Sequence, residues 1–192
     1  AFSLFLEPRL DVYNERWAPS TNSYRRYDAA ASLMAGLVYT YNGVQARPAH
    51  TAERPDAFRN SSIGLSAGLT TPLSFYDNWH SYMPVARLTY TRWTAPLLGW
   101  RAGVQGMMGR VDGGKRYAQA TVSADWLTDL TALSYGCDQA RLLAIRTVAG
   151  ASIGAAYRRP STRLAADVHA GVQAALRLSP SFSLTAEPTV SY

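Results

Sequence analysis

The sequence predicts an all-β fold, an antiparallel transmembrane β-barrel with about 8–10 strands visible in this chain. The main observation is the segment 163–178, in which apolar residues hold every even position and small or polar residues hold the odd ones. Successive strand side chains point to opposite faces, so this segment has one wet face and one apolar face. Soluble strands run about 5–6 residues, whereas a strand crossing a bilayer needs about 9–11.

The composition agrees with a membrane barrel. The 192 residues are 47% hydrophobic and only 17% charged, below the roughly 25% of an average soluble domain. No run of 18 apolar residues occurs, so a transmembrane helix is not expected. Tyr (12) and Trp (5) are frequent enough to form interfacial aromatic girdles. We expect two aromatic bands, with Trp93 and Trp100 in one of them, built from Trp17, Trp79, Trp93, Trp100, Trp126 and their Tyr neighbours. We interpret residues 1–192 as a single transmembrane β-barrel domain or a segment of one.

The net charge of +6 allows two interpretations. Nucleic-acid binding would need clustered basic residues, but the arginines are mostly scattered singly along the chain. We therefore expect outer-membrane lipid and lipopolysaccharide phosphates as partners, and no nucleic acid. The single cysteine, Cys137, rules out a disulfide within the chain.

The first half of the chain contains four strand candidates. Apolar residues at even positions indicate a strand over 2–13, and an Ala-rich alternation indicates another over 28–41. Small residues on one face mark a third over 59–71, and alternating Arg and Thr mark a fourth over 81–93. An irregular connection of the periplasmic type is expected near 42–58, where an Asn-Gly pair and two prolines occur.

The second half contains five strand candidates. The turn signal Asp112-Gly113-Gly114 predicts a hairpin between strands over 97–110 and 115–126. Residues 127–142 lose the two-residue period and are expected to form an irregular connection with a short helix. Strands then follow over 143–157, 163–178 and 182–192.

A repeat links the two ends of the sequence. The pattern Phe-Ser-Leu-x-x-Glu-Pro occurs at 2–8 and again at 182–188. Nine strands is an odd number for a bacterial barrel, and an open sheet edge in lipid is costly. We therefore expect more chain beyond Ala1 and Tyr192, which makes this segment part of a tandem-repeat barrel of about 14 or more strands.

Four segments carry a family resemblance: FSLFLEPRLDVY at 2–13, RWTAPLLGWRAGVQG at 92–106, ADWLTDLTALSYGCDQAR at 124–141 and RLSPSFSLTAEP at 177–188. With them the chain resembles the outer-membrane β-barrel proteins of Bacteroidota, of the OmpA-like barrel type. The resemblance is architectural and implies no catalytic residues. Compared with a complete member of that group, we expect this chain to lack a closing terminal strand and a periplasmic peptidoglycan-binding domain.

The alternation also assigns the candidate site residues. The expected lumen-lining residues are Glu7, Arg9, Arg87, Arg101, Gln105, Asp125, Arg146, Asp167, His169, Gln173 and Glu187. The expected lipid-facing residues are Leu164, Val168, Val172, Leu176, Val122 and Trp126. No metal site or cofactor is expected, because the three histidines share no ligand spacing.

These assignments support three functional hypotheses. The first is a non-enzymatic integral outer-membrane barrel that acts as a structural or accessory subunit with other outer-membrane or periplasmic proteins. The second is a porin-like channel with a polar, Arg-rich lumen. The third, which is remote, is a barrel hydrolase that uses Asp167 and His169, although no nucleophile motif accompanies this pair.

Overall fold

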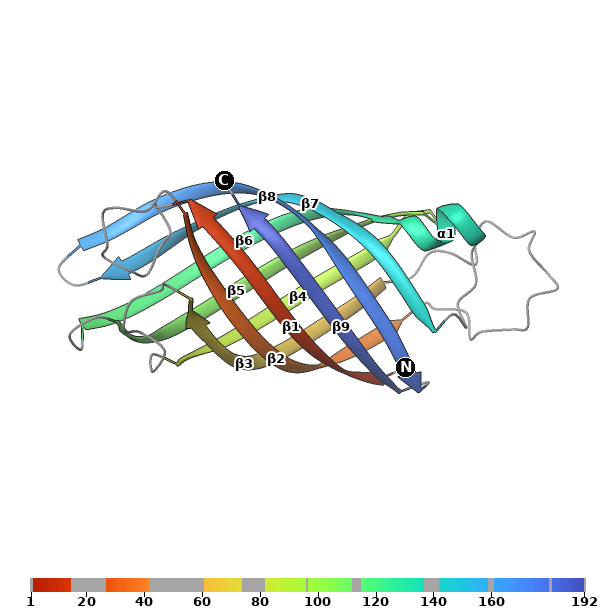
Figure 1. Cartoon of the computed structure of the whole chain (residues 1–192), viewed down its shortest axis with the longest axis horizontal. Helices are drawn as coiled ribbons and strands as arrows, with labels where there is room; N and C mark the ends of the chain where they lie inside the picture. Colours follow the sequence, from red (N-terminus) through yellow and green to blue (C-terminus); the bar gives the residue numbers. More distant parts are fainter. Residues whose placement is uncertain are drawn as a thin grey trace.

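The computed structural model describes residues 2–14, 27–41, 61–73, 82–95, 97–111, 115–136, 142–158, 161–179 and 181–191. Within these ranges the chain forms nine long strands and one short helix (Figure 1). The strands are β1 (Phe2–Asn14), β2 (Tyr27–Tyr41), β3 (Ser61–Pro72), β4 (Met83–Trp93), β5 (Leu98–Val111), β6 (Lys115–Asp129), β7 (Leu143–Arg158), β8 (Ser161–Ser179) and β9 (Phe182–Ser191). The helix α1 (Leu130–Tyr135) follows β6 directly.

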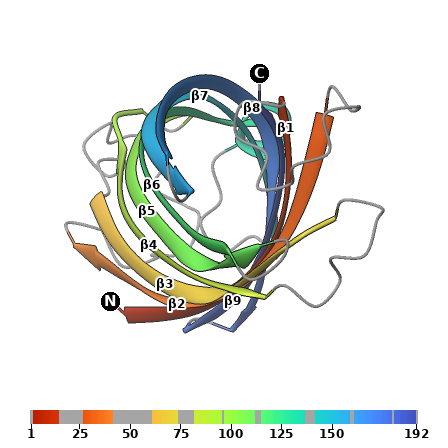
Figure 2. The same ribbon diagram turned by 90° about the vertical axis from the view of Figure 1, so that its left-hand side faces the viewer.

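The nine strands close into a single barrel in chain order, which Figure 2 shows in a view toward one end. Each strand pairs antiparallel with the next one along the chain. Direction alternates at every step, so the first and ninth strands run the same way. Closure therefore requires one parallel pair, in which Leu4 lies opposite Phe182 and Arg9 lies opposite Glu187.

This closure overturns the prediction of a larger barrel of about 14 strands. That prediction assumed that β1 and β9 had free edges and that bacterial barrels avoid a parallel pair. Instead, the two copies of the Phe-Ser-Leu-x-x-Glu-Pro pattern are hydrogen-bonding neighbours. The repeat places two carboxylates, Glu7 and Glu187, on adjacent strands with the same orientation.

The barrel has two ends, and each strand runs from one to the other. We call the end that carries α1 the helix end; β1 begins there, and residues 94–97 join β4 to β5 there (Figure 1). We call the other end the hairpin end; β5 and β6 meet there, as do β7 and β8.

The barrel is apolar outside and polar inside. Among the described residues, seven buried residues are hydrophobic, whereas twelve are polar or charged. Large apolar side chains are instead exposed on the outer face of the strands, as Leu65 and Ile153 illustrate. Small residues on the inner face leave space for long side chains. At Gly150, for example, a Cβ atom would lie only 2.6 Å from the Asp125 Oδ1 atom.

The segment 127–142 contains the predicted short helix, α1, but the strand before it ends later than predicted. The strand β6 continues to Asp129, so the alternation extends three residues beyond Trp126. The carboxylate of Asp129 then caps α1 by accepting a hydrogen bond from the Ala132 N–H at 2.8 Å. Gly136 ends the helix with a φ of 79°, a conformation that favours glycine. The predicted connection at 42–58 lies outside the described residues.

Candidate functional site

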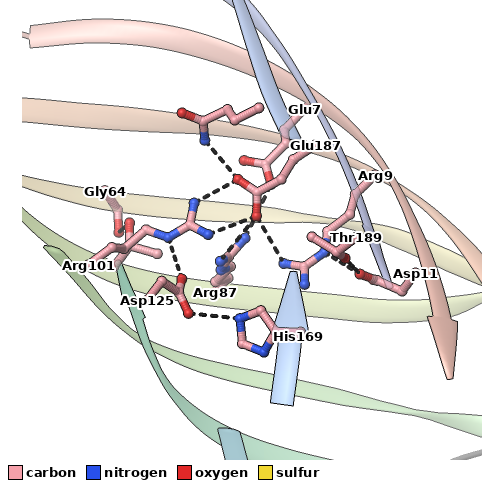
Figure 3. Close-up of polar contacts among 12 residues, drawn as sticks. Glu7, Arg9, Asp11, Gly64, Arg87, Arg101, Asp125, His169, Glu187 and Thr189 are labelled. Atoms are coloured by element: carbon pink, nitrogen blue, oxygen red, sulfur yellow. Dashed lines mark hydrogen bonds and ion pairs between the residues drawn. The ribbon is translucent and has the colours of Figure 1, made fainter. Parts of the chain in front are cut away.

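The candidate site is a network of charged and polar side chains inside the barrel (Figure 3). Its members come from β1, β4, β5, β6, β8 and β9, strands that curve around the same interior. On each of these six strands odd-numbered residues face inward, which brings residues distant in sequence into contact.

Glu187 is at the centre of this network and is fully buried. Its carboxylate accepts two hydrogen bonds from the Arg101 guanidinium, at 2.7 and 2.8 Å. It accepts a third from the Gln173 amide at 2.7 Å. The guanidinium groups of Arg87 and Arg9 lie 3.9 and 3.8 Å from the same carboxylate. Three guanidinium groups therefore lie within 4 Å of this one carboxylate, and burial of the carboxylate without such pairing would be prohibitive.

Asp125 extends the network across β6. Its Oδ2 atom accepts a hydrogen bond from Arg101 Nε at 2.6 Å, and its Oδ1 atom lies 2.9 Å from His169 Nε2. Arg101 is thus held between two carboxylates, Asp125 and Glu187, which fixes the guanidinium plane. Gly150 lies directly opposite His169 in the register and leaves room beside the Asp125 carboxylate.

Two further ion pairs involve carboxylates of β1, Glu7 and Asp11. Glu7 Oε1 accepts a hydrogen bond from Arg87 at 3.2 Å, so β1 and β4 are linked across the interior. Asp11 accepts a hydrogen bond from Arg9 Nε at 2.6 Å and another from the Thr189 hydroxyl. The contact between Asp11 and Thr189 also joins the parallel strands β1 and β9.

Arg146 lies in the interior toward the helix end. It donates to the Gln173 side-chain oxygen at 3.2 Å and to Asp129 at 3.5 Å. Its guanidinium carbon lies 5.1 Å from the centre of the Trp93 ring, a cation–π contact. Gln173 therefore connects the Arg146 group to Glu187 and to the central network.

The structure places all the predicted lumen-lining residues on the inner face, but not all of them join one network. Asp167 lies apart from the centre and accepts a hydrogen bond from the Ser152 hydroxyl. Gln105 faces inward between Gly103 and Met107. In the described part of the chain, the imidazole of His169 contacts Asp125, and the neighbouring Ser152 hydroxyl contacts Asp167. This geometry does not join a hydroxyl to a histidine base.

Sequence reasoning missed three members of the site. The alternation of β4 could have identified Trp93, because it shares the inner face with Arg87. The same rule applies to Thr189, which is two residues from Glu187. Asp129 was missed because β6 was expected to end at Trp126, so only the extension of the strand brings its carboxylate to Arg146.

The predicted lipid-facing residues lie on the outer face. Leu164, Val168 and Val172 are exposed on β8, and Leu176 is half-buried on the same side. Val122 and Trp126 are exposed on β6. Contact of these six side chains with lipid remains a prediction.

Within the described ranges, no group of three or more His, Cys, Asp or Glu side chains is arranged to hold a metal ion. No described helix is long and apolar enough to cross a membrane. The ion pairs of the network link strands across the interior of the barrel. Comparison with protein-family models, curated proteins and solved structures finds no match to this chain, so its assignment rests on sequence pattern and geometry.

Proposed function

We propose that this chain is an integral β-barrel of a bacterial outer membrane, without enzymatic activity, that acts as a structural or accessory subunit. The observation that carries the proposal is the inversion of polarity between the two faces of the wall. Soluble monomers rarely expose contiguous apolar patches larger than a few hundred Å². Here Leu65, Ile153, Leu164 and many other large apolar side chains are exposed around the barrel. A hydrocarbon environment would remove that exposure from water.

The length of the apolar face supports the same proposal. On β5, outward residues from Leu98 to Met108 carry no charge, and Arg110 is the next one. Ten residue steps at about 3.4 Å give roughly 34 Å along the strand. A strand tilt of 35–45° reduces this to about 24–28 Å along the barrel axis, close to the apolar band of about 25 Å in outer-membrane barrels.

Aromatic side chains lie near both limits of this face. Outward aromatics close to the helix end include Phe2, Tyr39, Tyr90, Trp100 and Trp126. The Tyr90 and Trp100 rings are in contact, with centroids 5.2 Å apart. At the hairpin end, Tyr82 and Tyr157 are exposed. Trp93 faces inward and does not join a band, contrary to the sequence prediction, and Trp17 and Trp79 lie outside the described residues.

The filled interior favours a structural role over the porin-like alternative. A barrel of about 8 strands has an interior just wide enough for side chains, whereas open aqueous channels need about 16. Nine strands are near the lower limit, and the network around Glu187 crosses the middle of the barrel. The helix α1 supports the accessory role. Its Leu133 and Tyr135 side chains are exposed at the helix end, where a partner protein could cover them.

Reconstitution into lipid vesicles tests both parts of the proposal. We expect the refolded chain to float with the vesicles in a density gradient, to resist carbonate extraction and to give a β-rich circular dichroism spectrum. In planar bilayers we expect no steady conductance of porin size. A chain that folds as a monomer in water without detergent would refute membrane residence, and large steady conductance would favour the porin-like alternative.

A further inference from the structure

Among the described residues, basic residues outside the interior network are more frequent at the hairpin end of the barrel than at the helix end, where Arg92 and Arg177 lie. Arg110 near the end of β5 and Arg116 near the start of β6 lie directly opposite each other, and both are exposed. Arg163 is exposed near the start of β8 at the same end, but it lies opposite Ala156 on the inner face. We call the outward pair Arg110 and Arg116 the basic rim. The backbones of Lys115 and Arg158 belong to the same strand ends.

The placement of Arg110 directly opposite Arg116 is unfavourable without a counter-ion. Like charges directly opposite each other on neighbouring strands destabilise a sheet. No described carboxylate forms an ion pair with Arg110, Arg116 or Arg163, whereas the interior arginines Arg87 and Arg101 are paired. Asp112 lies between Arg110 and Arg116 in the sequence and is outside the described residues. Cβ atoms of opposed residues are about 5 Å apart, so two guanidinium groups can contact one phosphate together.

The position of the pair relative to the apolar face identifies the kind of anion. Arg110 and Arg116 point outward, as Met108 does, and Arg110 follows Met108 by two residues. With a strand tilt of 35–45°, Arg110 lies about 5 Å farther along the barrel axis than Met108. Tyr157, opposite Ala118, lies at the same border. A charged group just beyond hydrocarbon and beside an interfacial tyrosine is at the level of lipid head groups.

We propose that the basic rim binds the phosphate groups of lipopolysaccharide through the Arg110–Arg116 pair, and that the hairpin end therefore faces the outer leaflet. This inference rests on the proposed membrane residence and adds a site and an orientation to it. Bidentate guanidinium–phosphate contacts supply the recognition. The bound phosphate neutralises the repulsion between the two opposed arginines.

A binding experiment tests the site. The full chain in detergent micelles is titrated with bis-phosphorylated lipid A, with its dephosphorylated form, and with inorganic phosphate as a competitor. We expect the R110Q/R116Q double variant to bind bis-phosphorylated lipid A about 30-fold more weakly, at roughly fivefold for each charge removed. The matched control is R92Q, an exposed outward arginine at the helix end, which should change affinity less than twofold.

Each contrary outcome has a definite meaning. Equal binding by the double variant, or an equal loss in R92Q, would overturn the site. Full displacement by equimolar inorganic phosphate would mean a free-anion site and would also overturn the lipid assignment. If the double variant does not fold, the proposal is tested on the wild-type chain alone. Equal affinity of that chain for bis-phosphorylated and dephosphorylated lipid A refutes the proposal. Vesicle flotation is measured first, so that failure to insert is distinguished from failure to bind.

Labelling in whole cells tests the orientation. In a Cys137→Ser background, Thr162→Cys at the hairpin end should react with a membrane-impermeant maleimide added outside. Ala95→Cys, in the turn at the helix end, should be protected until the outer membrane is opened. The reverse labelling pattern would overturn the orientation.

Discussion

Replacing Glu187 with Gln tests the charged network most directly, because the substitution keeps the size of the side chain and removes its charge. The Glu187 carboxylate accepts three hydrogen bonds at 2.7–2.8 Å, two from Arg101 and one from Gln173. Hydrogen bonds to a charged group contribute about 1.5–3 kcal/mol each, which gives a gross loss of about 4.5–9 kcal/mol. Arg101 keeps Asp125, and the Gln oxygen still accepts, so we expect a net loss of about 3–5 kcal/mol in the free energy of unfolding.

The assay is urea unfolding of the chain in lipid vesicles, followed by tryptophan fluorescence. The matched control is Asp167→Asn, which also removes an inner-face carboxylate but affects a single described hydrogen bond, from Ser152. We expect this control to cost about 1 kcal/mol. A double-mutant cycle with Arg101→Gln should give a coupling energy between Glu187 and Arg101 of about 1.5 kcal/mol or more.

A specific result would refute this reasoning. If Glu187→Gln and Asp167→Asn cost the same, within about 0.5 kcal/mol, the central network does not hold the wall together. Coupling near zero with Arg101 would lead to the same conclusion. Water in the interior would then have screened these charges, which would favour an open lumen.

Three other perturbations test separate parts of the structure. Val168→Arg places a charge on the exposed outer face of β8 and should cost about 2–4 kcal/mol in a bilayer or block assembly, as measured by urea unfolding in vesicles. Its control is Thr121→Arg on the inner face, where the opposed residues Gln105 and Gly154 carry no charge and the change should be mild; equal costs would contradict the assignment of faces. Gly150→Ala should cost about 1–3 kcal/mol in the same measurement, because the added Cβ would lie 2.5 Å from the Ala124 carbonyl oxygen; an unchanged midpoint would mean that β6 and β7 can separate freely there. Asp129→Ala should cost about 0.5–2 kcal/mol by removing the cap of α1, and hydrogen exchange at Ala132 should rise; unchanged exchange would show that the helix does not depend on this cap.

The structure changes one expectation that sequence alone would support. From its place on the wet face, Gln173→Arg would be expected to be a mild substitution. Gln173 is in fact buried, donates to Glu187 and accepts from Arg146. An arginine there would bring a further cation against Arg146 and Arg101. Thr121, whose opposed residues Gln105 and Gly154 are uncharged, is the better control for a charge on the inner face.

The sequence by itself determined the strands and their faces. Alternation is a local property, because neighbouring side chains on a strand must point to opposite sides. The inner placement of Glu7, Arg101 and Asp125 and the outer placement of Val168 follow from that rule alone. The limits of β6 were less certain, since Asp129 is both the last strand residue and the helix cap.

Only the tertiary structure decided how the strands close and which charges meet. Alternation says which face a side chain occupies, but it does not say which strand lies across the interior. The parallel pairing of β1 with β9 places Arg9 opposite Glu187, and barrel curvature brings Arg101 and Arg87 to the same carboxylate. These contacts join residues that are 80 or more positions apart. They depend on closure of the whole sheet, a global property that no local pattern records.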